Sequence, residues 1–318
     1  MYKLLFIFLL LTVLGYMYDM YKKNESKKIN LEHEDIVRRY LLNNDALTGS
    51  KPIVWVHIDY ETNSRHWLDF GGRNSKALNQ PYKLLTLKSI IKQAGDDFNV
   101  CIIDDYSFIK LMSNWSIDVS KLASPLKCHM RNLGLMNLLH KYGGMLVPSS
   151  YLALKNLSGL YDTGLNSKSC FIMETNNNNI SSTYTNAFPN HMFMGCKKNC
   201  DTIKELIQYI ERLNSRDFTD EQIFLGEVDK KCFEMVSKNK MTLLDGTLIG
   251  CFDKSGKPIL VDNLLQNSYI TLSHNNQGIL IPDKEILKRI KYQWFARMSP
   301  QQVLDANTIL SKYFVVSM

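Results

Sequence analysis

Asp104, Asp105 and Arg131 are the residues whose types and positions could hold a charged ligand. The two aspartates end the apolar run "FNVCIIDD", and Arg131 lies in or beside the apolar stripe of a predicted helix. Carboxylates bind hard divalent cations, and a guanidinium pairs with carboxylates or phosphates. Adjacent strand residues point to opposite faces, so both aspartates can bind one ion only if the chain turns there. A guanidinium in an apolar stripe must reach water or meet a carboxylate, so structural pairing and ligand binding both stay open.

Alternating strands and helices position these groups. "PIVWVHI" predicts a buried strand over residues 53–58, "QPYKLLTLKSIIKQAG" has helical spacing, and "FNVCIIDD" is a second strand. A helix over residues 124–142 comes next, and "MLV" after a glycine pair is the third strand. This order predicts an α/β fold with a mostly parallel central sheet flanked by helices, whose ligands bind beyond the carboxyl ends of the strands. The rule points to Asp104, Asp105 and the loop after His57.

The second half of the chain is less regular. Its strand-like runs are "SCFIME", "MTLL", "PILV", "YITL" and "GILI". Helices are predicted for "DTIKELIQYIERL" and for the basic stretch "PDKEILKRIKYQWFARM".

The first 50 residues predict an anchor and a stalk. "LLFIFLLLTVLGYMY", residues 4–18, is an unbroken apolar run with tyrosines near both ends, which is typical of a membrane helix. We interpret residues 1–21 as a single-pass transmembrane signal anchor, with a removed signal peptide and a buried core helix as alternatives. Residues 22–50 are polar and fit a stalk, and residues 51–318 form the globular domain.

The side of the membrane that would hold this domain is undecided between the lumen and the cytosol. Lysines after the apolar run favour a cytosolic domain by the positive-inside rule. Asn-x-Ser sequons favour a lumenal domain, because they are glycosylation sites of secreted proteins. They begin at Asn24, Asn114, Asn156 and Asn179.

Charge and cysteine content limit the function classes. The chain has 38 basic and 31 acidic residues, a net charge of +7, without a run of five basic residues. Nucleic-acid arms usually carry such runs, so the sequence predicts no nucleic-acid partner. The seven cysteines are scattered, and the close pair Cys196 and Cys200 lacks the second pair of a zinc site. Buried, unpaired thiols are therefore expected.

Three stretches carry a family resemblance: "IVWVH", "MRNLGLMNLLHKYGGMLV" and "NAFPNHMFMGCKKNCDTIKELIQYI", all within residues 52–215. They resemble the GT-A glycosyltransferases that contain a DXD sugar-binding region, including the capsular-polysaccharide and mannosyltransferase types. In that family a helix bearing an arginine ends on Gly-Gly, and the following strand delivers the DXD motif. Arg131, Gly143 and Gly144 keep this pattern.

The resemblance implies a nucleotide-sugar donor, a glycan or glycoprotein acceptor, and Mn²⁺ or Mg²⁺ held by the DXD carboxylates. Here Pro-Ser-Ser at residues 148–150 replaces that motif, and Cys128 replaces an acidic residue three positions before the arginine. Serine hydroxyls bind such ions poorly. We therefore expect no metal cofactor unless Asp104 or Asp105 substitutes for the lost ligands.

The resemblance also implies roles for individual residues. It implies donor binding by His57, Asp104, Asp105, Arg131, Gly143, Gly144, Ser149, Ser150 and His274. It implies acceptor binding by Asn186 and His191. An inverting mechanism needs a carboxylate that deprotonates the acceptor hydroxyl, and the candidates are Glu174, Asp220 and Glu221.

Several hypotheses for the whole protein stay open. The first is a glycosyltransferase that works without the DXD-bound metal, in which Arg131, Lys127 or Lys141 and backbone N–H groups stabilise the diphosphate. The second is a glycosyltransferase whose metal ligands come from another acidic pair. The third is a catalytically inactive relative that keeps the fold as a glycan-binding or scaffold protein. The last is an unrelated α/β protein whose glycine pair is a helix C-cap.

Overall fold

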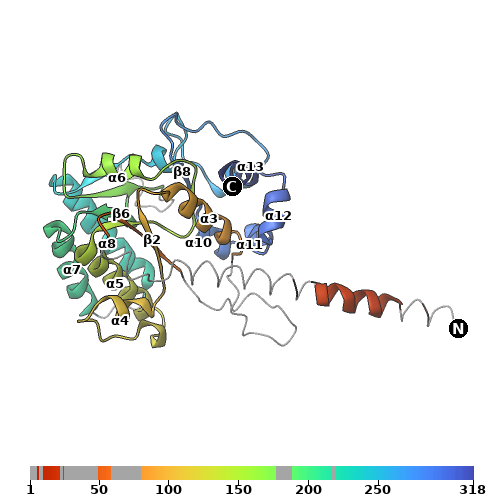
Figure 1. Ribbon diagram of the computed structural model, residues 1–318, viewed down its shortest axis with the longest axis horizontal. Coiled ribbons are helices and arrows are strands. Elements are labelled where there is room, and N and C mark those ends of the chain that lie inside the picture. Colours follow the sequence, from red (N-terminus) through yellow and green to blue (C-terminus); the bar gives the residue numbers. More distant parts are fainter. Residues whose placement is uncertain are drawn as a thin grey trace.

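A six-stranded mixed sheet lies at the centre of the computed structural model, which describes residues 6, 10–21, 24, 49–58, 80–176, 188–216 and 220–318 (Figure 1). The strands are β1 (Ile53–His57), β2 (Asn99–Ile103), β3 (Gly144–Leu146), β5 (Cys170–Glu174), β6 (Pro189–Cys196) and β7 (Thr242–Leu244). Their order is β2-β1-β3-β6-β5-β7, and β6 runs antiparallel to both of its neighbours whereas the other pairs are parallel. The carboxyl ends of five strands therefore share one edge of the sheet with the amino end of β6.

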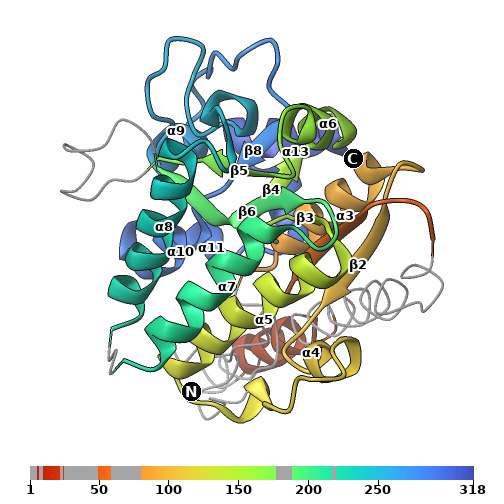
Figure 2. The same ribbon diagram turned by 90° about the vertical axis from the view of Figure 1, so that its left-hand side faces the viewer.

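Helices cover both faces of this sheet. They are α3 (Lys83–Ala94), α4 (Ser107–Leu111), α5 (Leu126–Tyr142), α6 (Ser158–Leu165), α7 (Asp201–Asn214) and α8 (Glu221–Ser237). Ile53 and Trp55 of β1 pack with α5, α7 and α8 on one face, and Val54 and Val56 pack with α3 and α6 on the other (Figure 2). Because alternate strand residues point to opposite faces, both sides of β1 are buried. The predicted α/β class with a mostly parallel, helix-flanked sheet is thus confirmed.

A third layer forms from the C-terminal part of the chain. It contains the two-stranded antiparallel sheet of β4 (Tyr151–Ala153) and β8 (Gly278–Leu280). Its helices are α9 (Val261–Leu265), α10 (Asp283–Lys288), α11 (Gln293–Ala296), α12 (Pro300–Asp305) and α13 (Ile309–Ser317). The short 3-10 helices are η1 (Val119–Lys121), η3 (Gly246–Ile249) and η4 (Ile290–Tyr292). Apolar residues of this layer pack on Tyr82 and Leu85 at the start of α3 (Figure 1).

The predicted single-pass membrane anchor is contradicted. Among the residues that the structure describes, no helix is both long enough and apolar enough to cross a membrane. The helical stretch over residues 10–21 rises about 18 Å at 1.5 Å per residue, against a hydrocarbon core of about 30 Å. The predicted stalk over residues 22–50 lies outside the described residues, except for residues 24, 49 and 50.

Candidate functional site

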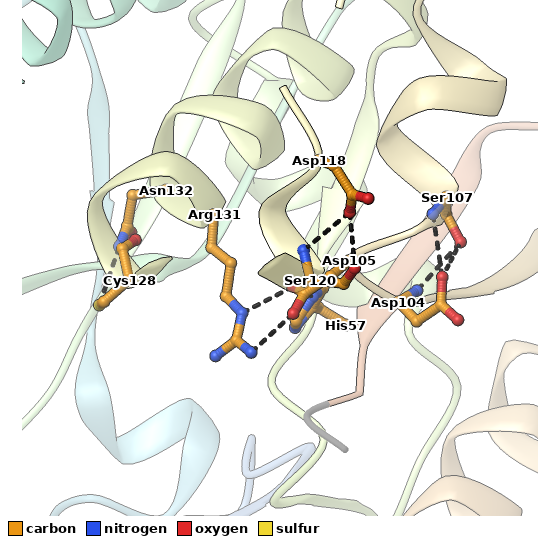
Figure 3. Close-up of polar contacts among 9 residues, drawn as sticks. All are labelled: His57, Asp104, Asp105, Ser107, Asp118, Ser120, Cys128, Arg131 and Asn132. Atoms are coloured by element: carbon orange, nitrogen blue, oxygen red, sulfur yellow. Dashed lines mark hydrogen bonds and ion pairs between the residues drawn. The ribbon is translucent and has the colours of Figure 1, made fainter. Parts of the chain in front are cut away.

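Three charged or titratable side chains from separate elements meet at the carboxyl edge of the sheet. Asp105 follows β2, His57 ends β1, and Arg131 projects from the second turn of α5 (Figure 3). Arg131 Nε donates to Asp105 Oδ1 at 2.7 Å and its Nη2 donates to Oδ2 at 2.8 Å. His57 Nε2 donates to Asp105 Oδ1 at 3.1 Å. The Asp105 carboxylate therefore links β1, β2 and α5 at the place where α/β sheets bind ligands.

The ion pair of Asp105 and Arg131 is largely shielded from water, since their side chains are 14% and 11% exposed. Burial acts to raise the pKa of Asp105, but the hydrogen bonds and positive charges of His57 and Arg131 outweigh it and lower the pKa to about 2. The carboxylate is therefore ionised at neutral pH. The His57 ring also stacks on the Phe108 ring, with ring centroids 5.9 Å apart.

Asp104 points away from this pair. Its Oδ1 accepts hydrogen bonds from the Ser107 N–H at 2.9 Å and from the Ser107 hydroxyl at 2.7 Å, which fixes the first turn of α4 (Figure 3). Asp104 and Asp105 thus diverge, as expected for adjacent residues at a strand end. Within the described ranges no group of three or more histidine, cysteine, aspartate or glutamate residues could hold a metal ion.

A second charged group faces α5 from the C-terminal half of the chain. Glu221 at the start of α8 contacts the Cys128 thiol, and Lys284 Nζ of α10 lies 3.5 Å from Glu221 Oε1. Cys128 is one helical turn before Arg131, so both groups border the same part of α5. The Lys284 side chain is 66% exposed, which makes it the more mobile cation of the two. Among the predicted catalytic carboxylates, the contacts place Glu221 beside the Arg131 region.

His191, near the start of β6, is buried between α5 and α8. Its Nδ1 lies 2.5 Å from Asp229 Oδ1, and its Nε2 lies 2.7 Å from Asn132 Oδ1. Asn132 Nδ2 donates to the Cys128 carbonyl at 2.8 Å, which fixes the orientation of this amide. Both ring nitrogens of His191 thus face side chains of neighbouring helices. His191 joins two helices to the sheet, and its predicted acceptor-binding role stays a prediction.

The glycine pair lies at the opposite edge of the sheet. Gly144 is level with Ile53 at the start of β1, four residues or roughly 13 Å before His57. Gly143 ends α5, with its N–H donating to Leu139 O at 2.8 Å and its carbonyl accepting from Trp55 Nε1 at 2.9 Å. Both glycines thus serve the backbone geometry at this edge, away from His57, and their predicted donor-binding role stays a prediction. Lys141 also lies away from Arg131, roughly 15 Å further along α5. Its Nζ donates to Leu111 O.

Ser149 and Ser150 do lie at the carboxyl edge. Val147 N donates to Trp55 O at 2.9 Å, so the chain leaves β3 level with His57. Both serines stand in a turn, Ser149 O accepts from Thr86 Oγ1 at 2.6 Å, and Ser150 O accepts from Ile281 N at 3.1 Å. Their carbonyls thus tie the turn to α3 and to the end of β8.

The remaining predicted residues are dispersed. Glu174 ends β5, four strand spacings or roughly 19 Å from the end of β2, and accepts from Gly246 N at 3.2 Å. Burial raises the pKa of Glu174, which the Gly246 N–H partly offsets. His274 is exposed, and its carbonyl accepts from Lys155 Nζ after β4, so its contacts lie with the small sheet. Asn186 lies outside the described residues.

Asp220 caps α8, and its hydrogen bonds within the described residues are to the first turn of that helix. Its Oδ1 accepts from the N–H groups of Gln222 at 2.7 Å and Ile223 at 3.4 Å. We expect Asp220→Ala to lower the free energy of unfolding by about 1 kcal/mol, and Asp220→Asn to change it little because asparagine also caps helices. Urea unfolding of the three proteins measures this. Equal stability of the alanine variant and the wild type would contradict the capping role.

Sequence reasoning did not identify Asn132, Asp229 and Lys284. Asn132 had a local signal, because it follows Arg131 and lies one turn after Cys128 on a predicted helix. Asp229 meets His191 across 38 positions of sequence, and Lys284 meets Glu221 across 63, so no local pattern joins them. No model of a known protein family matches the chain, and no curated protein matches it either.

Proposed function

We propose that this chain is a GT-A-like glycosyltransferase that binds a nucleotide-sugar donor at the carboxyl edge of β1, β2 and β3 and transfers the sugar to a glycan or protein acceptor. The observation that carries the proposal is the meeting of His57, Asp105 and Arg131, from three elements, at this edge. Open α/β sheets bind their ligands there, and a guanidinium is suited to phosphate groups. The arginine-bearing helix, glycine pair and strand "MLV" support the family resemblance in the order that the sequence predicts.

In this proposal Arg131, Lys284 and Glu221 have different roles in the transfer reaction. Negative charge builds up on the leaving diphosphate as the bond to the sugar breaks, and preoriented cations stabilise it. Asp105 holds Arg131 in one orientation, whereas the exposed Lys284 can move toward a ligand. In this proposal Glu221, which pairs with Lys284 at 3.5 Å, takes the proton of an acceptor hydroxyl.

Donor binding can be measured as a rise in the melting temperature of the full chain, because a ligand that binds only the folded state stabilises it. We expect one nucleoside-diphosphate sugar from a panel to raise the melting temperature, with a shift that persists in EDTA. Lys284→Ala should remove most of this shift. Lys230→Ala is the matched control, because Lys230 is 68% exposed on α8 and pairs only weakly with Glu227 at 3.9 Å. No shift with any donor would contradict the proposal.

A catalytically inactive relative is the second candidate function, and it is favoured by one observation: three of the carboxylates make hydrogen bonds that stabilise the fold. Asp104 fixes α4, Asp220 caps α8 and Glu174 binds the N–H of Gly246, so each already serves the fold. A catalytically inactive relative that binds glycans or partner proteins needs no general base. A donor that raises the melting temperature without being hydrolysed or transferred would favour this second function over the first.

A further inference from the structure

Three cysteines gather at the amino edge of the sheet, away from the site described above. Cys170 begins β5 and is paired in register with Cys196 at the end of β6, while Cys200 precedes the first turn of α7. All three are buried in one hydrophobic cluster. Cys170 and Cys200 are close enough that each thiol shifts the pKa of the other. All three are free thiols, as expected from the sequence.

Neighbouring contacts hold these two sulfurs together. Ser169 Oγ lies 3.3 Å from Cys200 Sγ, so the residue before Cys170 also contacts Cys200. Cys170 Sγ and Thr202 Oγ1 share one acceptor, the Lys240 carbonyl, at 3.7 Å and 3.4 Å. The start of β5 and the start of α7 thus meet at three side chains. A disulfide between the two would bring the sulfurs to about 2.05 Å from one another.

The two sulfurs are chemically unequal. The hydrogen bond from Cys170, helped by Ser169 and by the N–H groups of Ile203 and Thr202, lowers the pKa of Cys200 to about 5 against the opposing effect of burial. The same contact with Cys200, together with burial, raises the pKa of Cys170. Cys200 is therefore the more acidic thiol of the two, and the thiolate is the nucleophilic form of cysteine.

Access favours the same sulfur. Cys200 is 3% exposed and directly follows the exposed residues 197–199, whereas Cys170 is fully buried. The Cys196 thiol points away from the other two cysteines, toward α5, because it donates to the Leu139 carbonyl at 3.3 Å.

We propose that Cys170 and Cys200 are a peroxide-reactive pair that forms a reversible disulfide. The Cys200 thiolate attacks one peroxide oxygen, the O–O bond breaks, and the sulfur becomes a sulfenic acid while hydroxide leaves. The Cys170 sulfur then attacks the Cys200 sulfur, the new S–S bond forms, and the sulfenic oxygen leaves as water with the Cys170 proton. Two thiols and one hydrogen peroxide thus yield one disulfide and two water molecules.

The test treats the full chain with hydrogen peroxide, alkylates the remaining thiols under denaturing conditions and identifies the peptides by mass spectrometry. We expect a Cys170–Cys200 linked peptide that dithiothreitol removes, with the other five cysteines alkylated. In Cys170→Ser, dimedone added together with the denaturant after peroxide treatment should label Cys200, because its sulfenic acid has no partner. Cys200→Ser should abolish the link yet still fold, since serine is a preferred N-cap. Cys232→Ser, at a buried thiol of α8, is the control that should keep the link.

Two results would overturn the proposal. One is a Cys200 that is alkylated as completely as Cys232 after peroxide treatment, which would show that the thiolate does not react. The other is a disulfide that joins Cys196 to either residue or joins two chains. Neither result depends on donor binding, because the cysteine pair lies at the opposite edge of the sheet from Arg131.

Discussion

Replacing Gly144 with alanine is expected to lower the free energy of unfolding by more than about 3 kcal/mol, a large part of the 5–15 kcal/mol that a typical domain possesses. Gly144 has a φ of +95°, a region that residues with a Cβ adopt only with strain. An added Cβ would lie 2.1 Å from the Ile53 carbonyl oxygen. That oxygen belongs to the backbone of the central strand β1, so it cannot turn aside as a side chain would. Relief requires β3 to separate from β1.

Urea unfolding, or the yield of soluble protein where the variant does not fold, measures this loss. Gly226→Ala is the matched control, because Gly226 lies inside α8 with open space around its Cα. Alanine is a better helix former than glycine, so this control should be more stable than the wild type by about 0.5–1 kcal/mol. A Gly144→Ala protein that unfolds at the wild-type urea concentration would contradict the close approach of β3 to β1.

The elements around the site could be predicted because each has a strong local signal. The β-branched run of β1, the two aspartates after β2 and the glycine pair after α5 are all visible in short windows of sequence. The run "PILV" has a similar composition, yet it forms only an isolated bridge between Phe252 and Pro258 before α9 begins at Val261. Likewise the basic stretch after Pro282 is interrupted by the extended backbone of Arg289. The apolar composition of a short run predicts that the run is buried. Whether it pairs as a strand depends on neighbours that are distant in sequence.

The site itself was predictable only in part. A guanidinium on an apolar stripe requires a carboxylate, and the strand-end rule supplied Asp104 and Asp105 as candidates. Which of the two aspartates pairs with Arg131 depends on the turn into α4. There the Ser107 N–H donates a hydrogen bond to Asp104, which leaves Asp105 to pair with Arg131. The position of the glycine pair relative to the site could not be predicted, because the motif fixes its order in the sequence and not its edge of the sheet. Edge position follows from strand direction, since β3 begins at Gly144 and reaches the site only after Val147.

Asp105→Asn is expected to destabilise the fold by about 3–5 kcal/mol, because it removes the charge that compensates a buried guanidinium. An asparagine amide offers one acceptor oxygen where Arg131 and His57 now use two, and it turns an N–H₂ group toward donors. Asp104→Asn is the adjacent control, since asparagine also caps helix starts and should change stability by less than about 1 kcal/mol. Urea unfolding at neutral pH compares the three proteins.

The same carboxylate predicts how this difference changes with pH. The pKa of Asp105 is about 2 in the folded protein, and that of an aspartate in an unfolded chain is about 3.9. Because the folded pKa is the lower one, the ionised group stabilises the fold fully above about pH 4, by roughly 2.5 kcal/mol at 1.36 kcal/mol per pKa unit. This contribution disappears as the pH falls from about 4 to about 2. The gap in stability between the wild type and Asp105→Asn should therefore narrow between pH 4 and pH 2, and a constant gap over that range would contradict the assigned ion pair.

A double variant separates the unpaired charge from the loss of the pair. Arg131→Met leaves Asp105 without its bidentate partner and should be destabilising by an amount similar to that of Asp105→Asn. Combining the two removes both charges, and replacing a buried pair by apolar or neutral groups is often close to neutral. We therefore expect the double variant to be more stable than the sum of the single losses predicts, with a coupling of about 1–3 kcal/mol. Simple additivity would mean that Asp105 and Arg131 act independently, and the ordered guanidinium on which donor binding rests would then have to be held by other contacts.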